Sequence, residues 1–288
     1  MTATSTSVTS LVTAPNLTIQ AANGISYAYR RFGPASTLPP VIFLQHFRGN
    51  IDNWDYLLVD TIARQREVIL VDNTGVGLTG GTTPSTVAQM TTDLLAFIDA
   101  LELKRIDVLG FSLGGFIAQE LALVRPQLVN RLVLAGTGPQ GAAGMHGWRR
   151  DIADRTRADN AGIEDILYVF YAHTATSQAV GGQVIARLFS RADGRDSDVS
   201  FAARDAQYDA IVTWGIPNHT ALQRLTGITA PTLILQGDSD LMLVPRQSHL
   251  MAGLIPDARL VIYPDASHGS IFQYADSAAR EVLTFLSE

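Results

Sequence analysis

Residues 109–115 read LGFSLGG and set one serine between two glycines, where an apolar run gives way to an amphipathic one. The run RIDVL before this stretch is typical of a buried strand, and FIAQELALV after it has helical spacing. A sharp strand-to-helix turn brings the residues on either side of the serine into close contact, which favours the glycines at Gly110 and Gly114. The stretch therefore predicts a Ser112 hydroxyl raised above a sheet, beside the free N–H groups of a helix N-terminus.

Short apolar runs alternate with longer amphipathic segments along the chain, which indicates an α/β fold with a mainly parallel sheet covered by helices. The patterns predict helices at 91–103 and 116–126 and strands at 25–33, 41–45, 67–72, 106–110, 131–136, 231–237 and 258–265. Strand signals vanish from about residue 137 to residue 216, where helical spacing takes over. We therefore expect a loose N-terminus at 1–13, a core in two parts at 14–137 and 217–288, and a helical cap inserted at 138–216.

The composition limits the classes of function. The 288 residues are 47% hydrophobic and 17% charged, with a net charge of -6, which is typical of a well-packed globular protein. No basic patch stands out, so nucleic acid is not an expected partner. No apolar run reaches the roughly 18 residues of a membrane span, and the Ser/Thr-rich start lacks the features of a signal peptide, so we expect a cytoplasmic protein with no membrane partner. The absence of cysteine excludes thiolate chemistry.

A serine nucleophile needs a base that accepts its proton and an acid that orients the base. His268, in YPDASHGS, directly follows the last predicted strand, from which it can reach back over the sheet. The acid is expected after the preceding strand, where GDSD offers Asp238 and Asp240. Asp265 is so close to His268 in the sequence that a role in shaping the turn is more plausible. The order serine, aspartate, histidine along the chain is expected of one fold in particular.

The chain resembles the α/β-hydrolase superfamily over roughly residues 24–288. The resemblance rests on the stretches GFSLGG, GDSD, DASHG, HFRGN and DNTGVGLTG. The resemblance implies an α/β-hydrolase fold in which Ser112 is the nucleophile, His268 the base and Asp240 the acid. It also implies that the insertion at 138–216 is a cap domain. Within the superfamily, the sequence is most similar to small cap-bearing esterases and cofactor-free haloperoxidases.

The expected oxyanion hole departs from the family pattern of His-Gly-x, because QHFRGN has Phe47 where the glycine would stand. One backbone donor should still come from this loop, and we predict the N–H of Phe47, with Arg48 as the alternative. The N–H of Leu113, the residue after the nucleophile, is the expected second donor. His46 matches a structural histidine of the family. The Arg48 side chain is either a solvated loop charge or a partner for an acidic substrate group.

Aromatic residues of the insertion and of the core are candidates for an apolar acyl pocket. The candidates are Phe116, Trp148, Tyr168, Phe170 and Trp214. The competing interpretation is strong, because aromatic side chains at helical spacing more often pack a cap against its core.

The stretch GVGLTG at residues 75–80 is a literal match to the dinucleotide-binding motif. However, the following GTTPST predicts a loop where the motif requires a helix, so these glycines more simply serve a turn. The sequence also has no cluster of residues with the spacing of metal ligands. We therefore predict neither a cofactor nor a metal.

Taken together, the residues predict a serine hydrolase that cleaves a small-molecule carboxylic ester or lactone through an acyl-enzyme on Ser112. Peroxide replacing water on the same acyl-enzyme would make it a perhydrolase or haloperoxidase, and this alternative stays open. A third hypothesis is a ligand receptor that retains a triad and hardly turns over. A carboxylate nucleophile is disfavoured because the residue at the turn is serine. The sequence neither predicts nor excludes a homo-oligomer.

Overall fold

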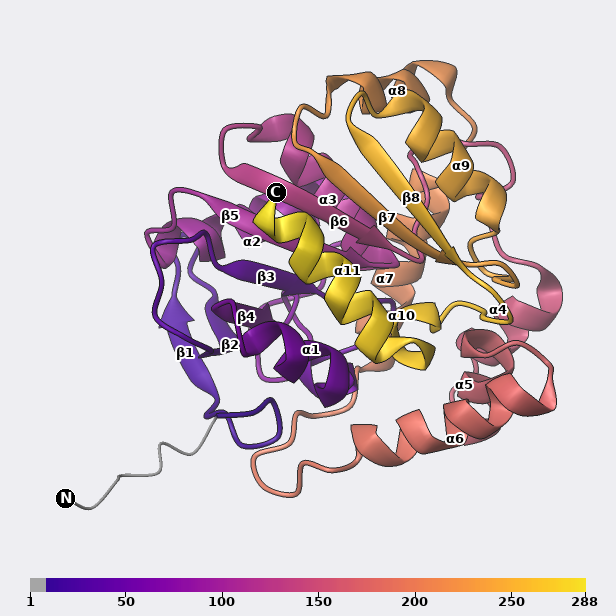
Figure 1. Cartoon of the computed structure of the whole chain (residues 1–288), viewed down its shortest axis with the longest axis horizontal. Helices are drawn as coiled ribbons and strands as arrows, with labels where there is room; N and C mark the ends of the chain where they lie inside the picture. The colour runs from indigo at the N-terminus through magenta and orange to yellow at the C-terminus, as the bar shows by residue number, and fades with distance from the viewer. Residues whose placement is uncertain (1–8) are drawn as a thin grey trace.

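The computed structural model describes residues 9–288, and within them eight strands form one sheet in the order β1-β2-β4-β3-β5-β6-β7-β8 (Figure 1). The strands are β1 (Leu17–Gln20), β2 (Ser26–Phe32), β3 (Val41–Leu44), β4 (Val68–Val71), β5 (Ile106–Phe111), β6 (Val129–Ala135), β7 (Thr232–Gly237) and β8 (Ala258–Tyr263). The β1–β2 and β2–β4 pairs are antiparallel, and every other pair is parallel. The predicted fold class is confirmed.

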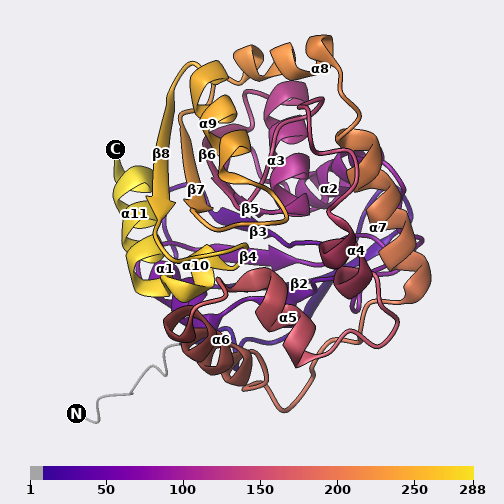
Figure 2. The same cartoon turned by 90° about the vertical axis from the view of Figure 1, so that its right-hand side faces the viewer.

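Helices cover both faces of the sheet, so its inner strands are buried on both sides (Figure 2). In β3, Ile42 and Leu44 belong to the core under one face, whereas Val41 and Phe43 belong to the core under the other. A strand buried on both faces needs apolar residues at successive positions, which is why VIFL reads as an uninterrupted apolar run. The helices of the core are α1 (Tyr56–Ala63), α2 (Val87–Ala100), α3 (Leu113–Val124), α8 (His219–Gln223), α9 (Pro245–Leu254), α10 (Ser270–Gln273) and α11 (Ala275–Ser287), with short 3-10 turns η1 (Ile51–Asn53) and η2 (Arg224–Gly227).

The segment between β6 and β7 contains the helices expected of the insertion. They are α4 (Arg150–Thr156), α5 (Ile163–Phe170), α6 (Ala175–Leu188) and α7 (Phe201–Trp214). In Figure 2, α4, α5 and α6 lie together on one side of the sheet, and α7 runs along its flank. Residues of α5 and α6 share a cavity with Ser112, which follows the carboxyl end of β5. The insertion therefore covers the end of the sheet that carries the serine.

Two N-terminal features differ from the sequence prediction. The strand β1 was not predicted, because it has four residues, lies at the sheet edge and is only half buried, which gives a weak pattern. The predicted loose segment 1–13 lies partly outside the described residues, but Leu11 within it is buried, and its N–H donates to Asp60 Oδ1 at 2.8 Å. Residues 9–13 therefore include a segment that packs on α1.

The GVGLTG segment forms a loop, as expected, and the next helix does not begin until Val87. Gly77 has a φ of 58°, and a Cβ atom there would meet the Asp72 carboxylate at 2.5 Å. The glycine is thus required by the turn itself. Separately, none of the helices described for residues 9–288 is both long and apolar enough to cross a membrane.

Candidate active site

Ser112 forms the junction between β5 and α3. Its backbone has a φ of 56° and a ψ of -116°, a conformation that a residue with a side chain rarely adopts. The junction is fixed by hydrogen bonds from Ser112 N–H to Ala135 O at 2.9 Å and from Thr137 Oγ1 to Ser112 O at 2.8 Å. The Ser112 side chain makes no capping hydrogen bond to the helix, and the residue lines a cavity.

The glycines around Ser112 are required by close backbone approaches. A Cβ atom at Gly110 would overlap the carbonyl oxygen of Gly114, and one at Gly114 would overlap the carbonyl oxygen of Leu44. A Cβ atom at Gly115 would lie 2.5 Å from Thr137 Oγ1. The smallness predicted for positions 110 and 114 therefore follows from contacts of the turn with β3 and with its own helix.

His268 lies in the loop after β8 and is paired with Asp240 from the loop after β7. The distance between His268 Nδ1 and Asp240 Oδ2 is 2.9 Å, and both side chains are buried. Asp240 also accepts hydrogen bonds from Met242 N–H at 2.8 Å, Leu243 N–H at 2.9 Å and Gln236 Nε2 at 3.0 Å. With the Nδ1 proton donated to this fixed carboxylate, His268 Nε2 is left as the free lone pair of the ring.

Asp238 occupies a different position in the same loop. It is exposed, and its carboxylate accepts hydrogen bonds from Ser239 Oγ at 2.7 Å, Asp265 N–H at 3.1 Å and Ala266 N–H at 3.3 Å. Asp265 itself has a positive φ of 49°. Asp238 therefore holds the turn that leads to His268, while Asp240 contacts the histidine.

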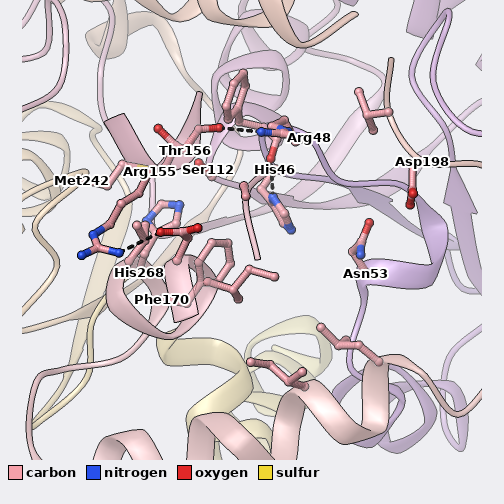
Figure 3. A pocket seen from close by; sticks show the side chains of 18 of the residues that line it. His46, Arg48, Asn53, Ser112, Arg155, Thr156, Phe170, Asp198, Met242 and His268 are labelled. Atoms are coloured by element: carbon pink, nitrogen blue, oxygen red, sulfur yellow. Dashed lines mark hydrogen bonds and ion pairs between the residues drawn. The ribbon is translucent and has the colours of Figure 1, made fainter. Parts of the chain in front are cut away.

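His46 stands in the loop after β3 and lines the same cavity as Ser112 (Figure 3). Its Nδ1 donates to Phe47 O at 2.7 Å, and its ring packs against Phe111 and Phe170 with centroid distances of 5.3 and 5.2 Å. Removal of the ring from bulk water, together with the nearby His268, lowers the pKa of His46 to about 3. His46 is therefore neutral near pH 7.

The backbone N–H groups of Phe47 and Leu113 have no acceptor among residues 9–288. Leu113 is the first residue of α3, where a helix leaves its N–H groups unpaired. The N–H of Arg48 instead donates to Gln207 Oε1 at 2.8 Å. Of the two positions considered for the loop donor, Phe47 has the unused N–H group.

The cavity has a volume of about 740 Å³ and contains Ser112, His268 and His46 in its wall. Helices α5 and α6 form an apolar wall with Ile166, Val169, Phe170, Ile185 and Leu188. Figure 3 shows Asn53 and Asp198 on the side away from His268. The volume suits a ligand of several hundred daltons. Within the described residues, no group of three or more His, Asp or Glu side chains is arranged to hold a metal ion.

Four of the five aromatic residues predicted for the pocket lie outside the cavity lining. Phe170 lines the cavity. Phe116 and Trp214 are buried and stacked with their rings 5.2 Å apart, Trp148 packs on Phe47 at 5.3 Å, and the Tyr168 hydroxyl donates to Asp151. The competing interpretation, packing of the insertion on the core, thus describes Phe116, Trp148 and Trp214.

The aliphatic wall of the cavity was not predicted. Ile185 and Leu188 lie one turn apart on α6, and this spacing is the same as that of residues that pack a helix on a core. A second unpredicted feature is Arg155, which lines the cavity, pairs with Asp165 at 2.7 Å and lies 4.0 Å from the centre of the Tyr168 ring. Ile185 and Leu188 come from α6 and Arg155 comes from α4, and only the folded arrangement of these helices around the cavity could have assigned them to the site.

Comparisons with known proteins agree with the fold. The family model of the alpha/beta hydrolase fold matches residues 39–274. The solved structure of an alpha/beta hydrolase fold protein from Chitinophaga pinensis is 38% identical, with a TM-score of 0.92, and the match covers 97% of this chain and 100% of that chain. A hydrolase from Pseudomonas aeruginosa is 28% identical, with a TM-score of 0.76 and coverage of 95% and 98%.

Among curated proteins, the Mycobacterium tuberculosis protein named "Putative non-heme bromoperoxidase BpoC" is 27% identical over 257 residues. The match covers 86% of this chain and 94% of that protein. The family match spans most of the chain and includes the strand-to-helix turn at Ser112 and the loops of Asp240 and His268. The chain therefore belongs to the alpha/beta hydrolase fold family.

Proposed function

We propose that the protein is a serine hydrolase that cleaves a carboxylic ester or lactone through an acyl-enzyme on Ser112. The proposal rests on the arrangement of three side chains. Ser112 stands at a strained turn in a cavity that it shares with His268, and His268 is held by Asp240 at 2.9 Å. A nucleophile, a base and an orienting acid in this arrangement perform acyl transfer on several unrelated folds.

In the proposed reaction, Ser112 Oγ attacks the substrate carbonyl carbon while its proton passes to His268 Nε2. The electron pair of the carbonyl π bond moves to the oxygen, which accepts hydrogen bonds from the N–H groups of Phe47 and Leu113. Collapse of this intermediate expels the alcohol, which takes the proton from His268. Water then repeats the cycle on the acyl-enzyme, and Asp240 holds His268 in the required tautomer throughout without taking a proton itself.

An active-site-directed phosphonate ester provides the first test. We expect it to add covalently to Ser112, and we expect Ser112→Ala to lose both this labelling and the hydrolysis of p-nitrophenyl esters while keeping the melting temperature of the parent protein. Peptide mass mapping identifies the labelled residue. Labelling elsewhere, or ester hydrolysis that persists without Ser112, would rule the proposal out.

Similarity to the protein named as a bromoperoxidase favours one second candidate, a perhydrolase on the same residues. In that reaction hydrogen peroxide attacks the acyl-enzyme in place of water and releases a peracid, which then oxidises halide. Peroxide-dependent halogenation that requires both acetate and Ser112 would support this activity. Halogenation that is independent of acetate would argue against it.

A further inference from the structure

The loop that bears Phe47 contains a strained turn formed by an unusual residue. Residues 46–49 form a turn closed by a hydrogen bond from Gly49 N–H to His46 O at 3.0 Å. Arg48, at the third position, has a φ of 60°, a value that glycine or asparagine normally supplies there. An arginine at this position is destabilising unless other contacts compensate.

Arg48 makes those contacts with the insertion. Its N–H donates to Gln207 Oε1 at 2.8 Å, and Gln207 is fully buried on α7. Its Nη1 donates to the carbonyl oxygens of Thr156 at 2.9 Å and Ala158 at 2.8 Å, at and beyond the end of α4. The guanidinium is thus neither a solvated loop charge nor free to bind an acidic substrate group through this nitrogen. Through its guanidinium and its backbone N–H, Arg48 joins the loop to two separate segments of the insertion.

The peptide unit between Phe47 and Arg48 is held at both ends. Its carbonyl oxygen accepts from His46 Nδ1 at 2.7 Å, and its N–H donates to Gln207. A flip of this peptide would move Arg48 out of the strained region and would break both hydrogen bonds. In addition, the Phe47 ring packs on Trp148 and on Tyr208 of α7, with centroid distances of 5.3 and 6.4 Å.

The distribution of backbone strain supports a functional reason for this arrangement. Within residues 9–288, the non-glycine residues with positive φ are Arg48, Glu102, Ser112 and Asp265. Ser112 forms the turn of the proposed nucleophile, and Asp265 lies in the loop that carries His268. Glu102 is exposed between α2 and β5, away from the cavity lining. Strained residues that persist in several loops of one site are typical of a preorganised site.

We propose that Arg48 and Gln207 are positioning residues that couple the insertion to the oxyanion hole. By holding the strained turn, they keep the Phe47 N–H without an internal acceptor and directed to the oxygen that becomes charged during acyl transfer. The inference rests on the proposed function, since it requires acyl transfer at Ser112. It adds that the insertion, besides enclosing substrate, maintains one of the two oxyanion donors.

Arg48→Gly is the decisive variant, because glycine relieves the backbone strain while it removes the guanidinium. If Arg48 were only a structural residue, the variant would fold and turn over p-nitrophenyl butyrate normally. We expect kcat to fall by about tenfold to hundredfold with KM changed by less than about twofold, somewhat less than the loss of a whole oxyanion donor. The affinity of a boronic acid, which forms a tetrahedral adduct with the serine, should fall by a similar factor.

Three further variants complete the test. Arg48→Lys should restore most of kcat, because a single nitrogen donates to both carbonyl oxygens and an ammonium group can replace it. Gln207→Met, which removes the acceptor at similar volume, should reproduce the Arg48→Gly defect. Glu102→Gly is the matched control, since it relieves the same kind of strain at an exposed site and should leave kcat unchanged.

The outcomes separate this inference from the proposed function. If Ser112 is labelled normally and Arg48→Gly keeps full kcat and full boronate affinity, the positioning role is wrong while the serine mechanism stands. If Arg48→Lys is as defective as Arg48→Gly, the two carbonyl contacts are not what matters and the role is equally wrong. Failure of the parent protein to react at Ser112 would overturn the proposed function and this inference with it.

Discussion

Two aspartates that stand two positions apart, Asp238 and Asp240, are expected to differ sharply in their contribution to turnover. Asp240 is buried, contacts His268 Nδ1 at 2.9 Å and accepts from two backbone N–H groups. We expect Asp240→Asn to lower kcat by up to about four orders of magnitude, because the amide favours the wrong tautomer of His268. Steady-state hydrolysis of a p-nitrophenyl ester, with circular dichroism to verify folding, measures this effect.

Asp238→Asn is the matched comparison for that variant. Asp238 accepts N–H groups of Asp265 and Ala266 and does not contact His268. Its substitution should cost on the order of 1 kcal/mol of stability and change kcat much less. If Asp238→Asn were inactive and Asp240→Asn active, the assignment of the acid would be reversed while the serine mechanism remained.

Gly114 is expected to tolerate no side chain. A Cβ atom there would overlap the backbone carbonyl oxygen of Leu44, which cannot rotate away as a flexible side chain could. We expect Gly114→Ala to destabilise the protein by about 1–3 kcal/mol or more, as overpacking in a core does, and to impair labelling of Ser112. Thermal unfolding measures the first effect, and Gly182→Ala supplies the control.

Gly182 lies exposed in α6, where a Cβ atom would have no neighbour within 4 Å. Alanine should therefore stabilise this helix by about 0.5–1 kcal/mol. Equal effects of the two substitutions would show that the close approach at Gly114 does not constrain the turn.

At the scale of elements, helix α6 is expected to limit the length of the acyl or alcohol chain. Leu188, on its last turn, is partly exposed and lines the cavity, so a larger side chain has room to project into it. We expect Leu188→Trp to lower the ratio of kcat/KM for octanoate over acetate esters by about tenfold, since each buried methylene contributes about 0.8 kcal/mol. A series of p-nitrophenyl esters measures this ratio.

Trp214→Phe tests whether a residue outside the cavity lining also affects the chain-length ratio. Trp214 is buried, stacks on Phe116 and donates its Nε1 to Gly138 O at 3.2 Å, outside the cavity lining. The substitution should reduce stability and leave the chain-length ratio unchanged. If the ratio changed in Trp214→Phe and stayed the same in Leu188→Trp, the aromatic residues expected from the sequence, and not α6, would form the acyl pocket.

Elements whose pattern is local could be predicted from the sequence. The runs VIFL and VILV predict strands because burial on both faces removes all polar positions, and the glycines at 110 and 114 predict a turn because no other residue fits. The edge strand β1 has no such pattern. The cavity lining could not be read from the sequence, because Trp214 and Leu188 both stand on helices of the insertion and only long-range packing separates their roles.

At the scale of the whole molecule, buried polar contacts join the insertion to the core. Arg187 of α6 pairs with Asp55 at 2.6 Å. In the segment between α6 and α7, the N–H of Asp196 donates to Asp52 Oδ2 at 2.7 Å, and Asp52 pairs with Arg30 at 2.7 Å. The insertion is thus attached to the core through charged groups.

One of these attachments contains two carboxyl groups in a buried environment. The Oδ2 atoms of Asp72, after β4, and of Asp196 are buried, and neither meets a donor from the rest of the described chain. Burial first, and then the charge of Asp196, raise the pKa of Asp72 well above its usual range, and burial together with the charge of Asp52 raises the pKa of Asp196. A proton on Asp72 that is donated to Asp196 therefore gives both Oδ2 atoms a hydrogen-bond partner.

This pair predicts the pH dependence of stability. A carboxyl group whose pKa is raised by folding binds more protons in the folded than in the unfolded state. Its contribution to stability is therefore fully present below about pH 4 and is lost as the pH rises through the pKa of the folded state.

We expect Asp72→Asn, which keeps an acceptor for Ile51 N–H and supplies its own donor to Asp196, to behave like the protonated form at every pH. Its melting temperature should exceed that of the parent by about 2–4 °C at pH 8, and the difference should vanish near pH 4. Asp209→Asn, at an exposed position of α7, controls for the loss of one negative charge and should show no such trend. A variant that is less stable than the parent at pH 8 would show that Asp72 is ionised in the folded protein and that its charge helps to hold the insertion.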